Sequence, residues 1–170
     1  HWRQPGSMPS VQIKDVPDDT CATLKRRAAA ARQSLQVLVV DASVLAVALL
    51  DDGQDGDLAR DRLSGRGQLA APALIDLEVP WVWRGLPRRG RLSPSRAALA
   101  LEDLAALPLQ RAQHAPLLHR CWELRDNLTI YDAPYVALAE ALDATLLTGD
   151  RCLARATGPR CTIEVLSGPR

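Results

Sequence analysis

Two apolar runs in this sequence each end in an aspartate that is placed to do chemistry. Residues 37–40 lead directly into Asp41, and residues 144–149 lead into Asp150, about a hundred residues later. Short runs of this kind predict strands buried on both faces of a parallel sheet. The carboxyl ends of such strands lie on one edge, where ligands bind. We therefore expect the two carboxylates to meet at that edge.

Glu78 and Asp132 are the other two candidate acids. Glu78 is spaced at i+3 from Ile75 and i−4 from Val82, on an apolar helical stripe where an unpaired carboxylate is costly. Asp132 lies at the start of a predicted helix, two residues before a proline. Four adjacent carboxylates would repel one another without a cation, and Mg²⁺ prefers hard oxygen ligands. The neighbouring Asp76 remains an alternative to Glu78.

A helix-capping role explains three of these acids as well as a catalytic role does. Asp41, Asp132 and Asp150 each precede a predicted helix, where an aspartate side chain caps backbone N–H groups. By contrast, Glu140 and Asp143 are expected to face solvent. The sequence does not choose between capping and catalysis for any one of the three aspartates.

Strands and helices are predicted to alternate through the body of the chain. The predicted strands are 37–40, 69–71, 109–112, 145–148 and 162–166, and the predicted helices are 42–50, 57–64, 73–86, 95–107, 115–127, 132–142 and a short one from 150. This alternation predicts an α/β fold, with a parallel sheet flanked by helices.

Composition indicates one cytoplasmic domain with an appendage. The chain has 170 residues, 47% of them apolar, and no apolar run is long enough to span a membrane. Its net charge of +1 divides unevenly, because residues 1–36 carry six basic and three acidic groups. The four cysteines lack metal-site spacing and are expected to be reduced thiols.

The first 36 residues predict a strand and one helix. Residues 1–7 have the character of a tag or an upstream remnant, and residues 8–36 resemble part of the ribbon-helix-helix fold of antitoxin DNA-binding domains. The resemblance implies that Gln12 and Lys14 face DNA bases. The second helix of that fold is missing here, so weak operator binding or none is expected.

Four stretches together resemble PIN-domain nucleases, specifically the VapC-like ribonuclease toxins of toxin–antitoxin pairs. They are VVDAS, APALIDLEV, YDAPYVALAEAL and LLTGDRCLA, and they fall in order within residues 37–170. The resemblance implies RNA hydrolysis at a Mg²⁺ or Mn²⁺ site, a cognate antitoxin and a homodimer. It assigns catalysis and metal binding to Asp41, Glu78, Asp132 and Asp150, and a supporting role to the hydroxyls of Ser43 and Thr148.

Basic and aromatic residues in and after the predicted helix 73–86 are candidates for RNA binding. Arg84, Arg88 and Arg89 are suited to contact phosphates, and Trp81 and Trp83 are suited to stack on bases. A solvated loop with core or dimer-interface tryptophans is the simpler interpretation.

Two other functions are compatible with the residues alone. A metal-dependent phosphatase also has an aspartate after its first strand, but it usually needs a second aspartate two positions later, where this chain has Ser43. A non-catalytic regulator would bind operator DNA through its first residues and use the body as a scaffold. The set of four acids favours the nuclease over both.

Overall fold

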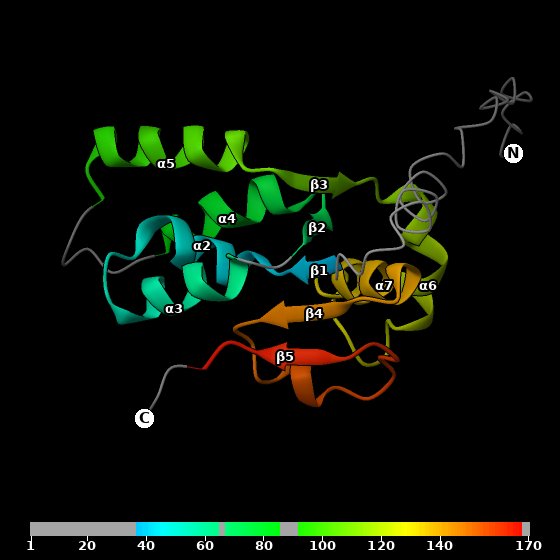
Figure 1. Ribbon diagram of the computed structural model, residues 1–170. Helices are drawn as coiled ribbons and strands as arrows, with labels where there is room; N and C mark the ends of the chain where they lie inside the picture. The colour runs from blue at the N-terminus through cyan, green and yellow to red at the C-terminus, as the bar shows by residue number, and fades with distance from the viewer. Residues whose placement is uncertain (1–36, 65–66, 86–91, 168–170) are drawn as a thin grey trace, which may run out of the picture.

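A computed structural model of the chain describes residues 37–64, 67–85 and 92–167. These residues contain a five-stranded parallel sheet with strand order β3-β2-β1-β4-β5 (Figure 1). The strands are β1 (Val37–Val40), β2 (Gln68–Pro72), β3 (Leu109–Ala112), β4 (Thr145–Thr148) and β5 (Ile163–Val165). The predicted α/β fold is confirmed.

The helices agree in place with the sequence prediction, with two differences. They are α2 (Ala42–Leu50), α3 (Gln54–Leu63), α4 (Ile75–Arg84), α5 (Pro94–Ala106), α6 (Leu118–Glu123) and α7 (Ala133–Leu142), with 3-10 turns η1 (Ala115–Leu117) and η2 (Leu153–Arg155). α3 begins three residues before the predicted start. The predicted helix 115–127 is instead η1 followed by the short α6, because the chain turns at Leu124.

β1 and β4 form the centre of the core and fix the position of the first aspartate. Val40 pairs in register with Leu147, and both side chains are buried. The backbone N–H of Asp41 then donates to the carbonyl of Leu147 at 2.9 Å, which continues the ladder by one residue. Asp41 therefore lies beside Thr148, the last residue of β4, at the carboxyl edge of the sheet.

The helices fall into two groups around the sheet. α2 packs against α3, α4 and α5, whereas α7 packs against α6 and η1 as well as β1, β2 and β4. α2 to α5 lie between β1, β2 and β3 in the chain, and α6 and α7 lie between β3 and β4. Because such crossovers are right-handed as a rule, the two sets are expected on opposite faces of the sheet. In Figure 1, α2 to α5 lie toward the left, and α6 and α7 toward the right.

The appendage predicted for residues 8–36, and the tag or remnant predicted for 1–7, lie outside the described residues. The partial ribbon-helix-helix segment and the boundary at residue 37 therefore stay predictions. Within the ranges described, no helix is both long and apolar enough to cross a membrane.

Candidate active site

Asp41 is held at the junction of β1 and α2 by two hydroxyl groups. Ser43 Oγ donates to Asp41 Oδ2 at 2.6 Å, and Thr148 Oγ1 donates to the same oxygen at 2.7 Å. Asp41 occupies the N-cap position of α2, but its side chain makes no cap hydrogen bond. The capping explanation therefore does not account for this carboxylate, whose other oxygen has no side-chain donor among the described residues.

The same two hydroxyls connect Asp41 to the chain that follows β4. Ser43 Oγ accepts from the backbone N–H of Gly149 at 2.9 Å, and Thr148 Oγ1 accepts from that of Asp150 at 3.0 Å. A Cβ atom at position 149 would lie 3.0 Å from Ser43 Oγ, so a glycine permits this close approach. Ser43 and Thr148 thus join the carboxyl ends of β1 and β4.

Glu78 on α4 is held by a hydroxyl from α7. Tyr135 Oη donates to Glu78 Oε2 at 2.5 Å. Its neighbour Asp76 is instead paired with Arg111, whose Nε lies 2.8 and 2.9 Å from the two carboxylate oxygens. The structure thereby separates the two acids that the sequence could not separate: Asp76 is neutralised by arginine, and Glu78 is not.

Asp132 and Asp150 differ in how they are held. Thr129 Oγ1 donates to Asp132 Oδ2 at 2.6 Å, and Asp132 makes no side-chain cap hydrogen bond to α7. The carboxylate of Asp150 is exposed and accepts from the backbone N–H of Cys152 at 2.6 Å. A local turn-capping role is therefore present at Asp150 but not at Asp132.

Three of the four carboxylates act on one another electrostatically. Burial raises the pKa of Asp41, and the charge of Asp132 raises it further against the hydroxyl hydrogen bonds. Burial likewise raises the pKa of Glu78, and the charges of Asp41 and Asp132 add to this effect. Asp41, Glu78 and Asp132 are thus close enough to repel, as expected for carboxylates that share one site.

The candidate acids, like several exposed acids, take no part in the ion pairs between described residues. Elsewhere the chain pairs carboxylates with arginine: Asp57 with Arg60, Asp76 with Arg111, Glu140 with Arg120, and Glu164 with Arg62. In the three described stretches, none of the four candidates has an arginine, lysine or histidine at ion-pair distance. Hydroxyl donors orient a carboxylate without neutralising it, so its negative charge remains available to a cation.

The side chains as they stand do not form a closed metal cage. In the portion of the chain that the structure covers, no group of three His, Cys, Asp or Glu side chains has the arrangement needed to hold an ion. The chemistry of the donors nevertheless fits a hard divalent cation, which accepts few protein carboxylates and keeps several waters.

The family model described as "PIN domain" matches residues 13–159. The chain belongs to the PIN-domain family. This match begins before β1 and so extends into the segment predicted to resemble an antitoxin.

The relatives of this PIN-domain chain are ribonucleases. It is 40% identical over 130 residues to the "VapC ribonuclease Mb0985" of Mycobacterium bovis, with 76% of this chain and 98% of the relative covered. It is 41% identical to "Ribonuclease VapC1" of Mycobacterium tuberculosis, with 75% and 96% covered. The chain therefore belongs to the VapC-like branch of the PIN-domain family, which confirms the family that the four sequence stretches indicated.

Solved structures agree with the fold. PAE2754 from Pyrobaculum aerophilum has a TM-score of 0.57 at 25% identity, with 77% of this chain and 85% of that chain covered. VapBC2 from Rickettsia felis, in a structure bound to a promoter DNA fragment, has a TM-score of 0.56 at 15% identity, with 76% and 98% covered. Both likenesses place the PIN-domain sheet and its helices in a known architecture.

The candidate RNA-binding residues of this PIN domain differ in how exposed their side chains are. Arg84 is exposed at the end of α4, whereas Arg88 and Arg89 lie outside the described residues. Trp81 is 69% exposed and Trp83 only 6%. The sequence alternative of a core tryptophan is therefore correct for Trp83, and Trp81 remains available for a contact.

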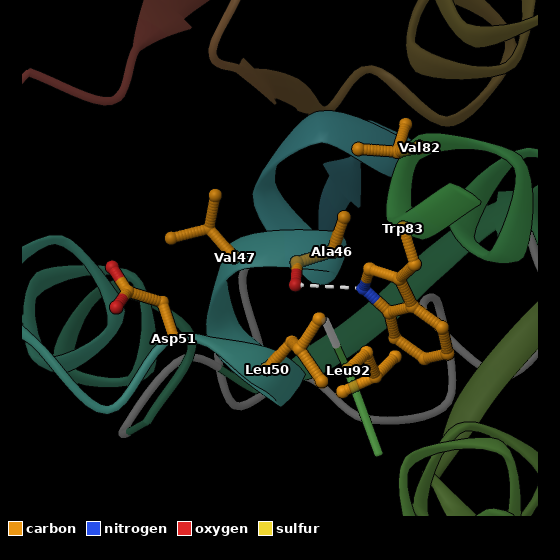
Figure 2. A pocket seen from close by; sticks show the side chains of 7 residues that line it. All are labelled: Ala46, Val47, Leu50, Asp51, Val82, Trp83 and Leu92. Carbon is orange, nitrogen blue, oxygen red and sulfur yellow. Dashed lines mark hydrogen bonds between the residues drawn. The ribbon is translucent and has the colours of Figure 1, made fainter. Parts of the chain in front are cut away.

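Trp83 borders an apolar pocket of about 340 Å³ between α2 and α4. Figure 2 shows its indole nitrogen directed at the carbonyl of Ala46, to which it donates at 3.0 Å. The lining residues are Ala46, Val47, Leu50, Asp51, Val82, Trp83 and Leu92. None of the four candidate acids borders this pocket, so it is separate from the carboxylate site.

Two residues of the site were missed by sequence reasoning. Tyr135 and Thr129 supply the hydroxyls that hold Glu78 and Asp132, in the same manner as Ser43 and Thr148 hold Asp41. Tyr135 lies in the YDAPYVALAEAL stretch, on the buried stripe of an apolar helix. A phenol in such a place needs a polar partner, and that requirement was the available signal.

Proposed function

We propose that this VapC-like protein is an endoribonuclease that hydrolyses RNA phosphodiester bonds with Mg²⁺, or Mn²⁺, held by Asp41, Glu78 and Asp132, with Asp150 at the rim. The observation that carries the proposal is the set of unneutralised carboxylates, two of which have raised pKa values, at the carboxyl edge of the sheet. Repulsion among them is relieved by a cation. A bound divalent ion supplies Lewis acidity and a more acidic water for attack on phosphorus.

The protein residues orient the carboxylates. Ser43 and Thr148 fix one oxygen of Asp41 from two sides, so its other oxygen is directed away from them. Thr129 does the same for one oxygen of Asp132. The acids therefore keep their charge while losing rotational freedom, which reduces the entropy lost when an ion binds.

RNA binding is assigned to the exposed end of α4. Arg84 provides a phosphate contact, and Arg88 and Arg89 follow it in the sequence. The expected result is that Arg84→Ala raises the KM for RNA and leaves the kcat within about twofold, because uniform binding is lost without a change at the reacting atoms.

A homodimer and a cognate antitoxin are the proposed partners. Leu77 and Trp81 lie one turn apart on α4 and are 73% and 69% exposed. Exposed apolar side chains that gather in this way favour a protein interface. Light scattering tests the homodimer: the mass should be twice the 18.5 kDa of the chain, and Trp81→Glu should lower it.

Cleavage of total RNA with and without a chelator tests the activity. Purified protein should cut RNA with Mg²⁺ or Mn²⁺ and should stop when EDTA is added. Asp132→Asn should lower the rate at least 100-fold, whereas Asp103→Asn, on the exposed surface of α5, is the matched control and should not. Cleavage that persists in EDTA, or in Asp132→Asn, would refute the metal mechanism.

A further inference from the structure

The hydrogen bond between Tyr135 and Glu78 joins the two groups of helices at the site. Tyr135 lies on α7 and Glu78 on α4, 57 residues apart in the chain, and their oxygens are 2.5 Å apart. α4 packs with α2, whereas α7 packs with β1, β2 and β4. The position of Glu78 relative to Asp41 therefore depends on a hydroxyl from the opposite group of helices.

Tyr135 is buried, and its hydroxyl acts as a donor. Its side chain is 1% exposed. Its hydroxyl donates to the Glu78 carboxylate, which is an acceptor. The phenol lies on α7, which packs against β1, the strand that leads into Asp41.

The hydrogen bond also selects which oxygen of Glu78 is left for a ligand. Tyr135 holds Oε2, and Oε1 receives no hydrogen bond from the described residues. A free glutamate side chain samples many rotamers, and fixing one of them costs free energy on binding. A carboxylate already held by a neutral donor avoids most of this cost and keeps its charge.

We propose that Tyr135 is a positioning residue of the metal site, whose hydroxyl holds Oε2 of Glu78 and leaves Oε1 available to a cation. The inference rests on the proposed function and adds a residue to it. Partners that orient metal ligands typically change metal affinity or activity 10–100-fold when they are removed. Tyr135→Phe removes the donor and keeps the ring in the core.

Mn²⁺ binding measured by calorimetry on the full chain, without RNA, tests the proposal. Tyr135→Phe should raise the Kd for Mn²⁺ by about 10–100-fold. Tyr131→Phe is the matched control, because Tyr131 is the other tyrosine of the chain and is 59% exposed. It should bind Mn²⁺ as the wild type does.

A double-mutant cycle with Glu78→Gln tests the route of the effect. If Tyr135 acts through Glu78, the two substitutions together should weaken Mn²⁺ binding no more than Glu78→Gln alone. If Tyr135→Phe weakens Mn²⁺ binding by the same factor in the Glu78→Gln background as in the wild type, the inference is overturned. A Tyr135→Phe protein that melts at a lower temperature but keeps its Kd for Mn²⁺ would also overturn it, since Tyr135 would then be a core residue only.

A measurement on the wild type covers the case in which Tyr135→Phe does not fold. The Tyr135 hydroxyl proton should give a protected, downfield NMR signal that remains when Mg²⁺ is added. Loss of this signal on Mg²⁺ addition would show that Glu78 leaves the tyrosine to bind, and would refute positioning. A wild type that binds no divalent ion and cuts no RNA would instead refute the proposed function, which distinguishes the two failures.

Discussion

Asp41→Asn should stabilise the metal-free protein while removing its response to metal. The asparagine side chain keeps an acceptor oxygen for the hydroxyls of Ser43 and Thr148 but carries no charge. Burial and Asp132 raise the pKa of Asp41, so its charged form is disfavoured in the fold.

We therefore expect the free energy of unfolding of Asp41→Asn in EDTA at pH 7.5 to exceed that of the wild type, because the variant does not bury a charge at this position. The melting temperature of the variant in EDTA should therefore lie above that of the wild type. Addition of Mn²⁺ at about 100 times its Kd should stabilise the wild type by about 2.7 kcal/mol and should leave the variant unchanged.

Asp76→Asn is the control for this experiment. Asp76 is paired with Arg111, and the two side chains are 42% and 24% exposed, so its loss should cost up to about 1 kcal/mol. Calorimetric melts with EDTA and with Mn²⁺ measure both variants. An Asp41→Asn protein that melts below the wild type in EDTA, or that still gains stability from Mn²⁺, would refute the account of an unneutralised metal-binding carboxylate.

Three further outcomes follow from the same contacts. Thr148→Val removes one of the two donors to Asp41 and should lower the RNA cleavage rate about 10–100-fold at limiting Mg²⁺, with partial recovery at high Mg²⁺ in a metal titration. Trp83→Phe loses the hydrogen bond to the Ala46 carbonyl and should cost about 1–2 kcal/mol in urea unfolding without any change in Mn²⁺ affinity. In EDTA, the free energy of unfolding should rise as the pH falls from 7.5 through the raised pKa values of Asp41 and Glu78, because the folded state binds protons at these two carboxylates more tightly than the unfolded state does. Thermal melts at a series of pH values that show no such rise would contradict the raised pKa values.

The parts of the fold that depend on local pattern were predictable from sequence. The apolar runs before Asp41 and Asp150 predicted β1 and β4 correctly, because a short apolar run between turn residues is typical of a buried strand. The break at Leu124 was not predictable, because the buried residues Leu117, Cys121 and Leu124 keep helical spacing through it.

Partners distant in the chain account for the remaining differences. Glu140 was expected to be solvated, and that prediction was wrong. Arg120 contacts it at 2.7 and 3.1 Å, and the N–H of Arg160 donates to it at 2.7 Å. Burial pushes the pKa of Glu140 upward, but these donors hold it below its usual value. Arg111 likewise pairs with Asp76, which is 35 residues away in the chain, and leaves Glu78 without an arginine. No local pattern identifies such pairs.

The joining of β1 to β4 through Ser43 and Thr148 has a consequence for how the protein responds to its surroundings. The oxygens and N–H groups involved belong to the polypeptide itself, so the shape of this corner does not depend on an ion being present. If a cation binds here as proposed, its departure would leave these four hydrogen bonds in place for the next ion. The supply of free divalent ions would then set how much of the protein is active.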